Sequence, residues 1–349
     1  MAVVLLPGVG APAQPRVSVC IANFNGAALL PDCIDSVLAQ DCEAAIEILV
    51  HDDASRDGSV TLLRSHYPQV HALVSEENVG FCISNNRMVD AAKGEYVLLL
   101  NNDAALPPQA VRQLLADAEL GGKPAILTLP QYDWETGTLV DRGCLLDPFH
   151  TPDPNLDLQH SDVAYVIGAC LWIPRTTWDE LGGFPEWFGS IAEDMYLCCA
   201  ARLRGIPVRC LGGSGYRHRQ GASFGGNRID GQRLSTRYHR RYLSERNRLA
   251  VLVACTPTWL AWPWLALHTV ALLAEGLLLS LLKATPRIWR EIYWAALRDV
   301  IRRRRQLLDQ RNALQARRTI SLVTYLRGFN AIPRKLVLLY RHGLPGIRG

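Results

Sequence analysis

Between Arg16 and about Ala125, short apolar runs alternate with amphipathic helical stretches. A short apolar run bounded by polar turn residues is typical of a buried strand, and apolar residues three or four positions apart are typical of a helix. Strands that alternate with helices favour a parallel sheet, because each helix returns the chain to the start of the next strand. The predicted strands are Val17–Ala22, Ile46–Val50, Val70–Val74 and Tyr96–Leu100, and helices are predicted at Leu29–Ala39, around Leu62, at Ile83–Ala92 and from Pro107-Pro108 onward.

The rest of the chain follows two other patterns. From Ala125 to Leu211, turn-rich segments surround one long apolar strand predicted at Val163–Ile173 and a helix predicted to start near Glu193. After about Glu245 the composition becomes strongly apolar and then basic. The sequence therefore predicts an N-terminal tail at 1–15, an α/β domain at 16–245 whose halves are 16–125 and 126–245, and a helical region at 246–349.

Composition excludes several classes of protein. With 49% hydrophobic and 20% charged residues, the chain is not disordered, and its Gly and Pro residues lack the period of a collagen. The 10 cysteines include no CxxC pair and no zinc-type cluster, so we expect reduced and mostly buried thiols. The first fifteen residues lack the positive region of a secretory signal, which favours a cytosolic location.

Polar residues follow three of the predicted strands. Asn23-Phe24-Asn25-Gly26 comes after the first strand, His51-Asp52-Asp53 after the second, and Asn101-Asn102-Asp103 after the fourth. Asp and Asn are ordinary turn residues. However, the carboxyl ends of parallel strands share one edge, where α/β folds bind ligands. Three polar ends at that edge favour a ligand site.

These residues also carry a family resemblance. IANFNG, HDDASRDGS, ENVGF and LLLNNDA, followed by IGACLWIPRTTWDELGGFPEWF, AEDMYLCCAARLRG and YRHRQGASFG, resemble in order the motifs of family 2 glycosyltransferases. The resemblance covers about residues 16–226 and implies the GT-A fold, a Rossmann-like nucleotide-diphospho-sugar transferase fold. Within the family, the wording is similar to the rhamnosyltransferase-like branch that builds bacterial surface polysaccharides.

The resemblance implies a site for a dTDP- or UDP-sugar donor and for a divalent metal. Residues 1–282 carry 21 Lys and Arg against 30 Asp and Glu, and such an acidic body holds a pyrophosphate through a divalent cation, Mg²⁺ or Mn²⁺. Asp103 is the expected metal ligand, and His218 is a second candidate unless it is a plain surface histidine. The sequence reads NND where the family often has two carboxylates, so we expect the substrate phosphates to supply much of the metal affinity. The residues expected at the donor are Asn23, Asn25, Asp52, Asp53, Asn78, Gly80, Asn101, Asn102 and Asp103.

The resemblance also implies the catalytic and acceptor-side residues. Asp194, in the Glu193-Asp194 pair, corresponds to the general base that takes a proton from an acceptor hydroxyl, and a single displacement of this kind inverts the anomeric configuration. Otherwise the pair is a simple helix N-terminal cap. Gly168 and Trp187 lie on the expected acceptor side. Other nearby aromatic residues, such as Trp172, are expected to be core.

The C-terminal region predicts attachment to a membrane surface. Leu249–Leu282 carries Glu275 as its one charge, and Pro257 and Pro263 leave about 19 apolar residues after them, close to the roughly 20 that span a bilayer. A single span would put the basic tail opposite the donor site, against the positive-inside rule. We therefore expect a peripheral or monotopic protein at the cytoplasmic face. A basic amphipathic stretch at Arg287–Gln315 fits anionic lipid. A soluble helical subdomain or an oligomer interface is the alternative.

Together these observations predict an inverting, metal-assisted glycosyltransferase that moves a sugar, for example L-rhamnose from dTDP-rhamnose, to a lipid-linked or cell-surface glycan. The alternative is a non-catalytic, nucleotide-sugar-binding scaffold of the same fold. No nucleic-acid partner is expected, since the arginine run lacks a readout fold. The donor, the acceptor, the linkage and the oligomeric state stay open.

Overall fold

The computed structural model describes residues 3–220, 228–230 and 233–348. The chain divides into two compact units, of which the first is Met1–Cys144, Pro154–Ser190 and Ile206–Ser223, and the second is Leu145–Asp153, Ile191–Gly205 and Phe224–Gly349. This division differs from the single boundary expected after residue 245. The segment Ile191–Gly205 belongs to the second unit because its helix packs against two helices of the C-terminal region.

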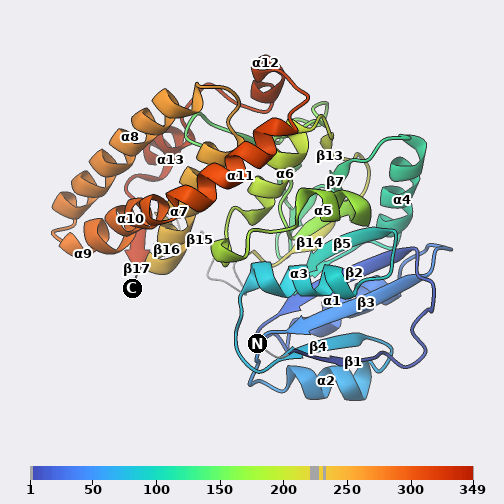
Figure 1. Cartoon of the computed structure of the whole chain (residues 1–349). Coiled ribbons are helices and arrows are strands. Elements are labelled where there is room, and N and C mark those ends of the chain that lie inside the picture. Colours follow the sequence, from blue (N-terminus) through green and yellow to red (C-terminus); the bar gives the residue numbers. More distant parts are fainter. Residues whose placement is uncertain (1–2, 221–227, 231–232, 349) are drawn as a thin grey trace. The chain divides into compact units, whose positions relative to one another are not determined.

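The first unit is built on an eight-stranded mixed sheet of order β1-β4-β3-β2-β5-β12-β7-β13 (Figure 1). The four strands predicted from the alternating pattern are confirmed and run parallel to one another. Two further strands, β1 and β12, join the sheet antiparallel. The strands are β1 (Val3–Leu6), β2 (Val17–Asn23), β3 (Ile46–Asp52), β4 (His71–Ser75), β5 (Tyr96–Asn101), β7 (Ile126–Thr128), β12 (Cys170–Pro174) and β13 (Val208–Cys210).

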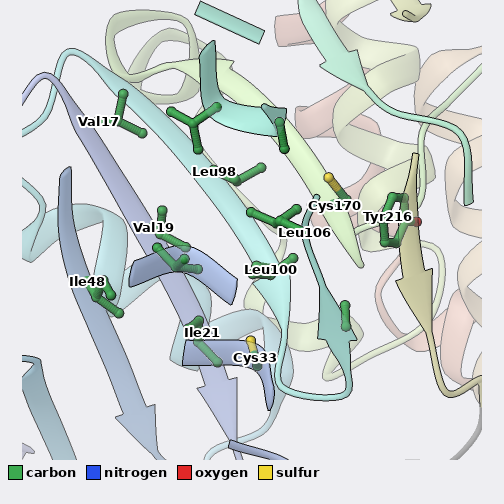
Figure 2. Packing of buried hydrophobic residues seen from close by; sticks show 14 of the residues in the cluster. Val17, Val19, Ile21, Cys33, Ile48, Leu98, Leu100, Leu106, Cys170 and Tyr216 are labelled. Carbon is green, nitrogen blue, oxygen red and sulfur yellow. The ribbon is translucent and has the colours of Figure 1, made fainter. Parts of the chain in front are cut away.

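The helices of the first unit enclose an apolar core that includes Val19, Ile21, Leu98 and Leu100 (Figure 2). Alternate residues of β2 and β5 point into this cluster because side chains in a strand alternate between the two faces of the sheet. The helices are α1 (Leu30–Leu38), α2 (Ser59–His66), α3 (Phe81–Ala91), α4 (Ala110–Leu120), α5 (Arg175–Leu181) and the 3₁₀ helix η1 (Glu186–Phe188).

Three expectations about this unit are wrong in detail. The predicted strand Val163–Ile173 is mostly irregular, because the chain turns at Gly168 and Ala169 and only β12 pairs with β5. Within the expected N-terminal tail, Val3–Leu6 is instead a strand that pairs with β4. The helix expected to begin at Pro107-Pro108 starts later, as α4, so the prolines precede it.

A second, four-stranded sheet in the first unit has the order β6-β14-β8-β9. Its strands are β6 (Ala104–Ala105), β14 (Tyr216–His218), β8 (Gln131–Asp133) and β9 (Leu139–Asp141). The antiparallel register pairs His218 with Ala104, directly after Asp103. Two short strands, β10 (Cys144–Leu146) and β11 (Pro152–Pro154), complete this part of the chain.

The second unit is mainly helical (Figure 1). Pro263 does not break the long apolar helix, because it occupies the first turn, where no backbone N–H partner is needed. The amphipathic stretch expected at Arg287–Gln315 is divided near Arg303. The elements are α6 (Glu193–Leu203), α7 (Tyr238–Cys255), α8 (Ala261–Leu282), α9 (Pro286–Ile288), the π-helix η2 (Trp289–Trp294), α10 (Ala295–Arg302), α11 (Arg304–Ala316), α12 (Leu322–Leu326), α13 (Arg334–His342), and strands β15 (Arg228–Asp230), β16 (Arg233–Arg237) and β17 (Gly346–Arg348).

The expectation for the cysteines is confirmed. All ten are free thiols, and all except the half-buried Cys42 are buried. They pack as small apolar side chains, and burial raises the pKa values of several of them, Cys20 and Cys33 among them.

Candidate active site

Polar residues that follow β2, β3 and β5 lie together at the carboxyl edge of these parallel strands. The side-chain amide of Asn23 donates to Oδ2 of Asp52 at 3.0 Å, and Nδ2 of Asn102 donates to Oδ1 of Asn23 at 2.9 Å. All three side chains are buried. One chain of hydrogen bonds thus links the ends of three neighbouring strands and fixes the loops that follow them.

The loops after β2 and β3 are tied to each other by Asn25 and Ser55. The backbone N–H of Asn25 donates to Ser55 Oγ at 2.8 Å, and the backbone N–H of Arg56 donates to Asn25 Oδ1 at 2.8 Å. Asn25 has a φ of 50°, in the left-handed region that asparagine adopts more readily than most residues. Sequence analysis missed Ser55, although Asp52 followed three residues later by a serine is a recognisable turn pattern.

The carboxylate of Asp53 holds the loop that begins α3. Its Oδ1 accepts from the backbone N–H of Val79 at 2.7 Å and its Oδ2 from that of Gly80 at 2.9 Å. Burial raises the pKa of Asp53, and these two hydrogen bonds oppose the rise. Position 80 favours glycine because its φ is 87°, a backbone conformation that residues with a Cβ rarely adopt. Asn78 is exposed beside it.

Asp103 and His218 form a buried pair at the same edge. Nε2 of His218 lies 3.0 Å from Oδ1 of Asp103 and 3.4 Å from Nδ2 of Asn101. On the other side of the ring, Nδ1 lies 3.2 Å from Oε1 of Gln131. Oε1 of Gln131 and Oδ1 of Asp103 are both acceptors, so each can accept a ring N–H. In the tautomer with the proton on Nδ1, the lone pair of Nε2 points toward Asp103.

This pair fits a divalent metal ion. Two acceptor atoms this close are stabilised by a cation or a proton between them, and a histidine whose second nitrogen is fixed by a hydrogen bond is the usual form of a metal ligand. Within residues 3–220, 228–230 and 233–348, no group of three or more His, Cys, Asp or Glu side chains is placed to hold a metal. The described part of the chain therefore offers a partial site that needs further ligands.

Two charged residues lie near this pair, Asp141 and Arg219, and sequence analysis missed the first of them. Asp141 is a buried carboxyl on β9, which pairs with β8, and burial raises its pKa to about 7 while the Gly143 N–H and the charge of His218 oppose the rise. Arg219 is held by an ion pair with Asp32 at 2.6 Å and stacks on Trp134 with its guanidinium 3.7 Å from the ring centre. No local sequence pattern marks either contact, because the partners lie far apart in the chain.

Of the two acceptor-side candidates, Gly168 lies next to the polar edge and Trp187 lies in η1. The carbonyl of Ala169, one residue after Gly168, accepts from the backbone N–H of Asn101 at 3.1 Å. Trp187 is half-buried and meets Phe188 edge to face at 4.6 Å. The expectation that most nearby aromatic residues are core is confirmed, since four of them are buried: Trp172, Trp178, Phe184 and Phe188.

Glu193 and Asp194 begin α6 in the second unit, after a strained turn. Ile191 has a φ of 72° and Ala192 a φ of 65°. The left-handed region is unfavourable for non-glycine residues and especially for a β-branched one, so neighbouring contacts must hold it. One such contact is visible: Nδ2 of the fully buried Asn247 donates to the carbonyl oxygen of Ile191 at 2.7 Å.

The two carboxyl groups of this pair are not equivalent. Burial, followed by the charge of Asp194, raises the pKa of Glu193 to about 8, and the nearby Arg240 opposes the rise. Oδ1 of Asp194 accepts from the backbone N–H of Met195 at 2.7 Å. Glu193 is therefore mostly neutral at pH 7.

A pH-dependent stability follows from Glu193. Its pKa is raised from 4.5 to about 8 in the folded chain, so its contribution to the free energy of unfolding is fully present below about pH 4.5 and is lost as the pH rises through about 8. Glu193→Gln keeps a neutral side chain and is expected to remove this loss. Urea unfolding of both proteins across this range measures it. Identical pH profiles would contradict the assignment.

The substitution Asn247→Ala tests whether the hydrogen bond from Asn247 to the Ile191 carbonyl oxygen stabilises the strained turn. The substitution leaves the carbonyl oxygen of the half-buried Ile191 without this donor, which costs about 1–3 kcal/mol of unfolding free energy. Asn312→Ala, at an exposed position in α11, is the control and is expected to stay within about 0.5 kcal/mol of the wild type. Urea unfolding measures both. Equal small effects of the two substitutions would show that Asn247 does not hold the turn.

Comparison with known proteins relates part of the chain to a known family. Residues 18–177 match the profile of Glycosyl transferase family 2. This part of the chain, slightly less than half of it, is thus similar to a glycosyltransferase family 2 domain. The matched region contains the polar edge from Asn23 to Asp103, whereas Trp187, Asp194 and His218 lie beyond it.

Curated relatives of this part of the chain act in polysaccharide biosynthesis. The chain is 26% identical over 230 residues, 60% of its length, to the O-antigen biosynthesis protein RfbC of Myxococcus xanthus. It is 31% identical over 93 residues, 26% of its length, to the putative teichuronic acid biosynthesis glycosyltransferase TuaG of Bacillus subtilis. The matches span only 18% of RfbC and 36% of TuaG.

Solved glycosyltransferases share the fold. The chain aligns with TarS of S. aureus at a TM-score of 0.50 and 17% identity, over 86% of this chain and 55% of TarS. It aligns with GalNAc-T7, solved with UDP, GalNAc and Mn²⁺, at a TM-score of 0.56 and 15% identity, over 69% of this chain and 48% of that one. The α/β GT-A fold expected from the sequence is thus that of its solved neighbours.

Proposed function

We propose that the chain is an inverting, metal-assisted glycosyltransferase that moves a sugar from a nucleoside-diphosphate donor to a hydroxyl group of a lipid-linked or cell-surface glycan. The observation that carries the proposal is the buried Asp103–His218 pair at the carboxyl edge of a domain similar to family 2 glycosyltransferases. GalNAc-T7, which shares the fold, was solved with a uridine diphosphate and Mn²⁺.

The donor is proposed to bind along the polar edge. Asn23, Asp52 and Asn102 keep the strand ends in register, and the loops fixed by Asn25 and Asp53 flank the base and ribose. Asp103 and His218 would hold a Mg²⁺ or Mn²⁺ ion, which when bound supplies charge stabilisation for the leaving nucleoside diphosphate. Arg219 adds a positive charge beside Asp103, because its backbone N–H donates to the carbonyl oxygen of Asp103 at 2.9 Å.

Asp194 is proposed to act as the general base. Its carboxylate takes the proton of the acceptor hydroxyl while that oxygen forms a bond to the anomeric carbon. The bond from the anomeric carbon to the phosphate oxygen breaks on the opposite face, and the electron pair leaves with the nucleoside diphosphate. The configuration at the anomeric carbon is therefore inverted. Neutral Glu193 adds no second negative charge beside the base.

The donor and acceptor classes come from the relatives and from the sequence motifs. RfbC and TuaG are named for the biosynthesis of surface polysaccharides, which supports a glycan acceptor. The motif resemblance to rhamnosyltransferases makes dTDP-rhamnose the first donor to test, with UDP- and GDP-sugars beside it.

Calorimetric titration of the purified chain with this panel, with and without Mn²⁺, tests the proposal, followed by release of the nucleoside diphosphate in the presence of glycolipid extracts. We expect Mn²⁺-dependent binding of one nucleotide class and its turnover. Binding without turnover would favour a nucleotide-sugar-binding scaffold instead. Absence of binding to every nucleotide would overturn the proposal.

A further inference from the structure

Helix α8 has one packed face and one exposed apolar face. Ala261, His268, Leu272, Gly276 and Leu279 are buried against the rest of the second unit. The packing is close, because a Cβ at Gly276 would lie 2.5 Å from the ring of Tyr293 in η2. The opposite side is exposed and consists of large apolar residues: Leu267, Val270, Leu277, Leu278, Leu281 and Leu282.

Within the described residues, α8 is the one helix long and apolar enough to cross a membrane, with a mean hydropathy of 2.0 over its most apolar 18 residues. Only 28% of that segment is buried, so most of it is not a core helix. Scattered exposed apolar residues are normal on a protein surface, but a continuous apolar helix face marks an interaction surface.

The ion pairs made by Glu275, on the packed face of α8, argue against a transmembrane orientation of this helix. Glu275 forms ion pairs with Arg241 of α7 and Lys335 of α13. The same two cations pair with the fully buried Glu245, and together with Arg248 they hold its pKa well below its usual range although burial alone would raise it. A helix fixed along its side to such a charged network could cross the hydrocarbon only by taking those charges with it, which is costly.

An arginine-rich stripe continues from the end of α8. Arg287, Arg290, Arg298 and Arg302 are 49–76% exposed at their side chains. Arg290, Trp294 and Arg298 are four residues apart and so lie on one side of the continuous η2 and α10 helices. Arg290 and Arg298 also line a hollow of about 400 Å³ together with Tyr242 and Glu291.

Exposed tryptophans accompany the apolar face at both ends. Trp259 and Trp262 stand at the start of α8, and Trp294 stands in the arginine stripe beyond its end. Tryptophan and arginine beside a continuous apolar face are typical of helices that lie in the headgroup layer, where rings and cations meet the lipid phosphates.

We propose that the outer face of α8, together with the arginine stripe, docks on an anionic lipid bilayer with the axis of α8 parallel to the membrane surface. The apolar face enters the headgroup and acyl boundary, and the arginines bind lipid phosphates. This proposal rests on the proposed function and deepens it, since a lipid-linked acceptor is present at the bilayer surface on which the protein would dock. Its evidence comes from the second unit alone, and its test does not require an assay of sugar transfer.

Vesicle flotation of the full chain tests the surface. We expect binding to phosphatidylcholine vesicles that contain phosphatidylglycerol and much weaker binding without the anionic lipid. Arg290→Glu/Arg298→Glu is expected to weaken binding more than tenfold, since each arginine attracts anionic lipid and each glutamate in its place repels it. Leu277→Gln/Leu281→Gln, which removes apolar contact, is expected to weaken it by a factor of about ten or more. Arg64→Glu/Lys123→Glu removes the same charge from exposed positions in the first unit and is the matched control.

Each alternative has its own outcome. Equal flotation of all variants and the control, or no binding to anionic vesicles, would overturn the proposal. A concentration-dependent dimer that Leu277→Gln/Leu281→Gln abolishes would instead assign the face to a second copy of the chain. Failure of donor binding with intact flotation would contradict the proposed function while leaving this surface in place.

Spin-label depth separates lying from spanning. Leu267→Cys and Leu278→Cys lie on the same side of α8, eleven residues and thus roughly 16 Å apart along its axis. If α8 lies in the plane of the membrane, both labels are expected at the same depth. A difference in depth close to their separation would show that α8 crosses the bilayer.

Discussion

Asp194→Asn is expected to lower the rate of sugar transfer by about 10² to 10⁴, the usual contribution of a general base. Asparagine keeps the size and the hydrogen bond to the Met195 N–H, but it cannot accept the proton of the acceptor hydroxyl. Donor binding is expected to change little, because Asp194 is not among the residues proposed to contact the donor. Transfer kinetics and donor titration on the same preparation measure the two effects separately.

Glu193→Gln is the matched control for this experiment. Because burial keeps Glu193 mostly neutral near pH 7, glutamine resembles its protonated form, and we expect a loss of less than about tenfold, well below that of the base. If Glu193→Gln were as damaging as Asp194→Asn, the two carboxyl groups would act as one unit. If Asp194→Asn transferred sugar at the wild-type rate, the base would be another residue.

The parallel half of the sheet was predictable because its signal is local. Residues 19–22 of β2 and 97–100 of β5 are apolar throughout, as is typical of buried parallel strands, and polar residues follow directly after them. The sequence therefore predicts a polar edge, and Asn23, Asp52 and Asn102 are in contact there.

The contacts that tune the candidate site were not predictable in this way. Gln131 reaches His218 through the pairing of β8 with β14, 87 residues apart in the chain, and Asn247 reaches Ile191 from 56 residues away. Neither has a spacing that a sequence pattern could reveal. The strand expected at Val163–Ile173 failed for a related reason, since hydrophobicity marks burial but not the turn at Gly168 that interrupts pairing.

The orientation of the apolar C-terminal helix α8 was also not predictable from the sequence. Its composition could not distinguish a spanning helix from a surface helix, since both need about 20 apolar residues. The distinction comes from Glu275, which is a lone charge in the sequence but part of an ion-pair network in the fold. The partners Arg241 and Lys335 come from helices on either side of α8 in the chain, so only the fold reveals them.

Asp103→Ala is expected to abolish the Mn²⁺-dependent part of nucleotide-diphosphate binding, because it removes the carboxylate of the pair that fits the metal. Gln131→Ala is expected to weaken Mn²⁺ affinity by about 10- to 100-fold without touching the ion, since Gln131 contacts Nδ1 and so orients the ring of His218. Titration of Mn²⁺ in the presence of nucleotide, followed by electron paramagnetic resonance, measures both. Asp41→Ala removes an exposed carboxylate from the same unit and serves as the control.

Asn101→Asp tests the same metal site by adding a candidate ligand, whereas Asp103→Ala removes one. Nδ2 of Asn101 already lies 3.4 Å from His218 Nε2, so a carboxylate there would stand beside the metal-facing nitrogen and supply a third ligand. We expect Mn²⁺ affinity without nucleotide to rise by about tenfold, or 1.4 kcal/mol, because affinity for hard cations grows with the number of charged ligands. If Asn101→Asp left Mn²⁺ affinity unchanged and Asp103→Ala bound nucleotide with the same Mn²⁺ dependence as the wild type, the metal would lie elsewhere, and the Asp103–His218 pair would be a structural hydrogen bond.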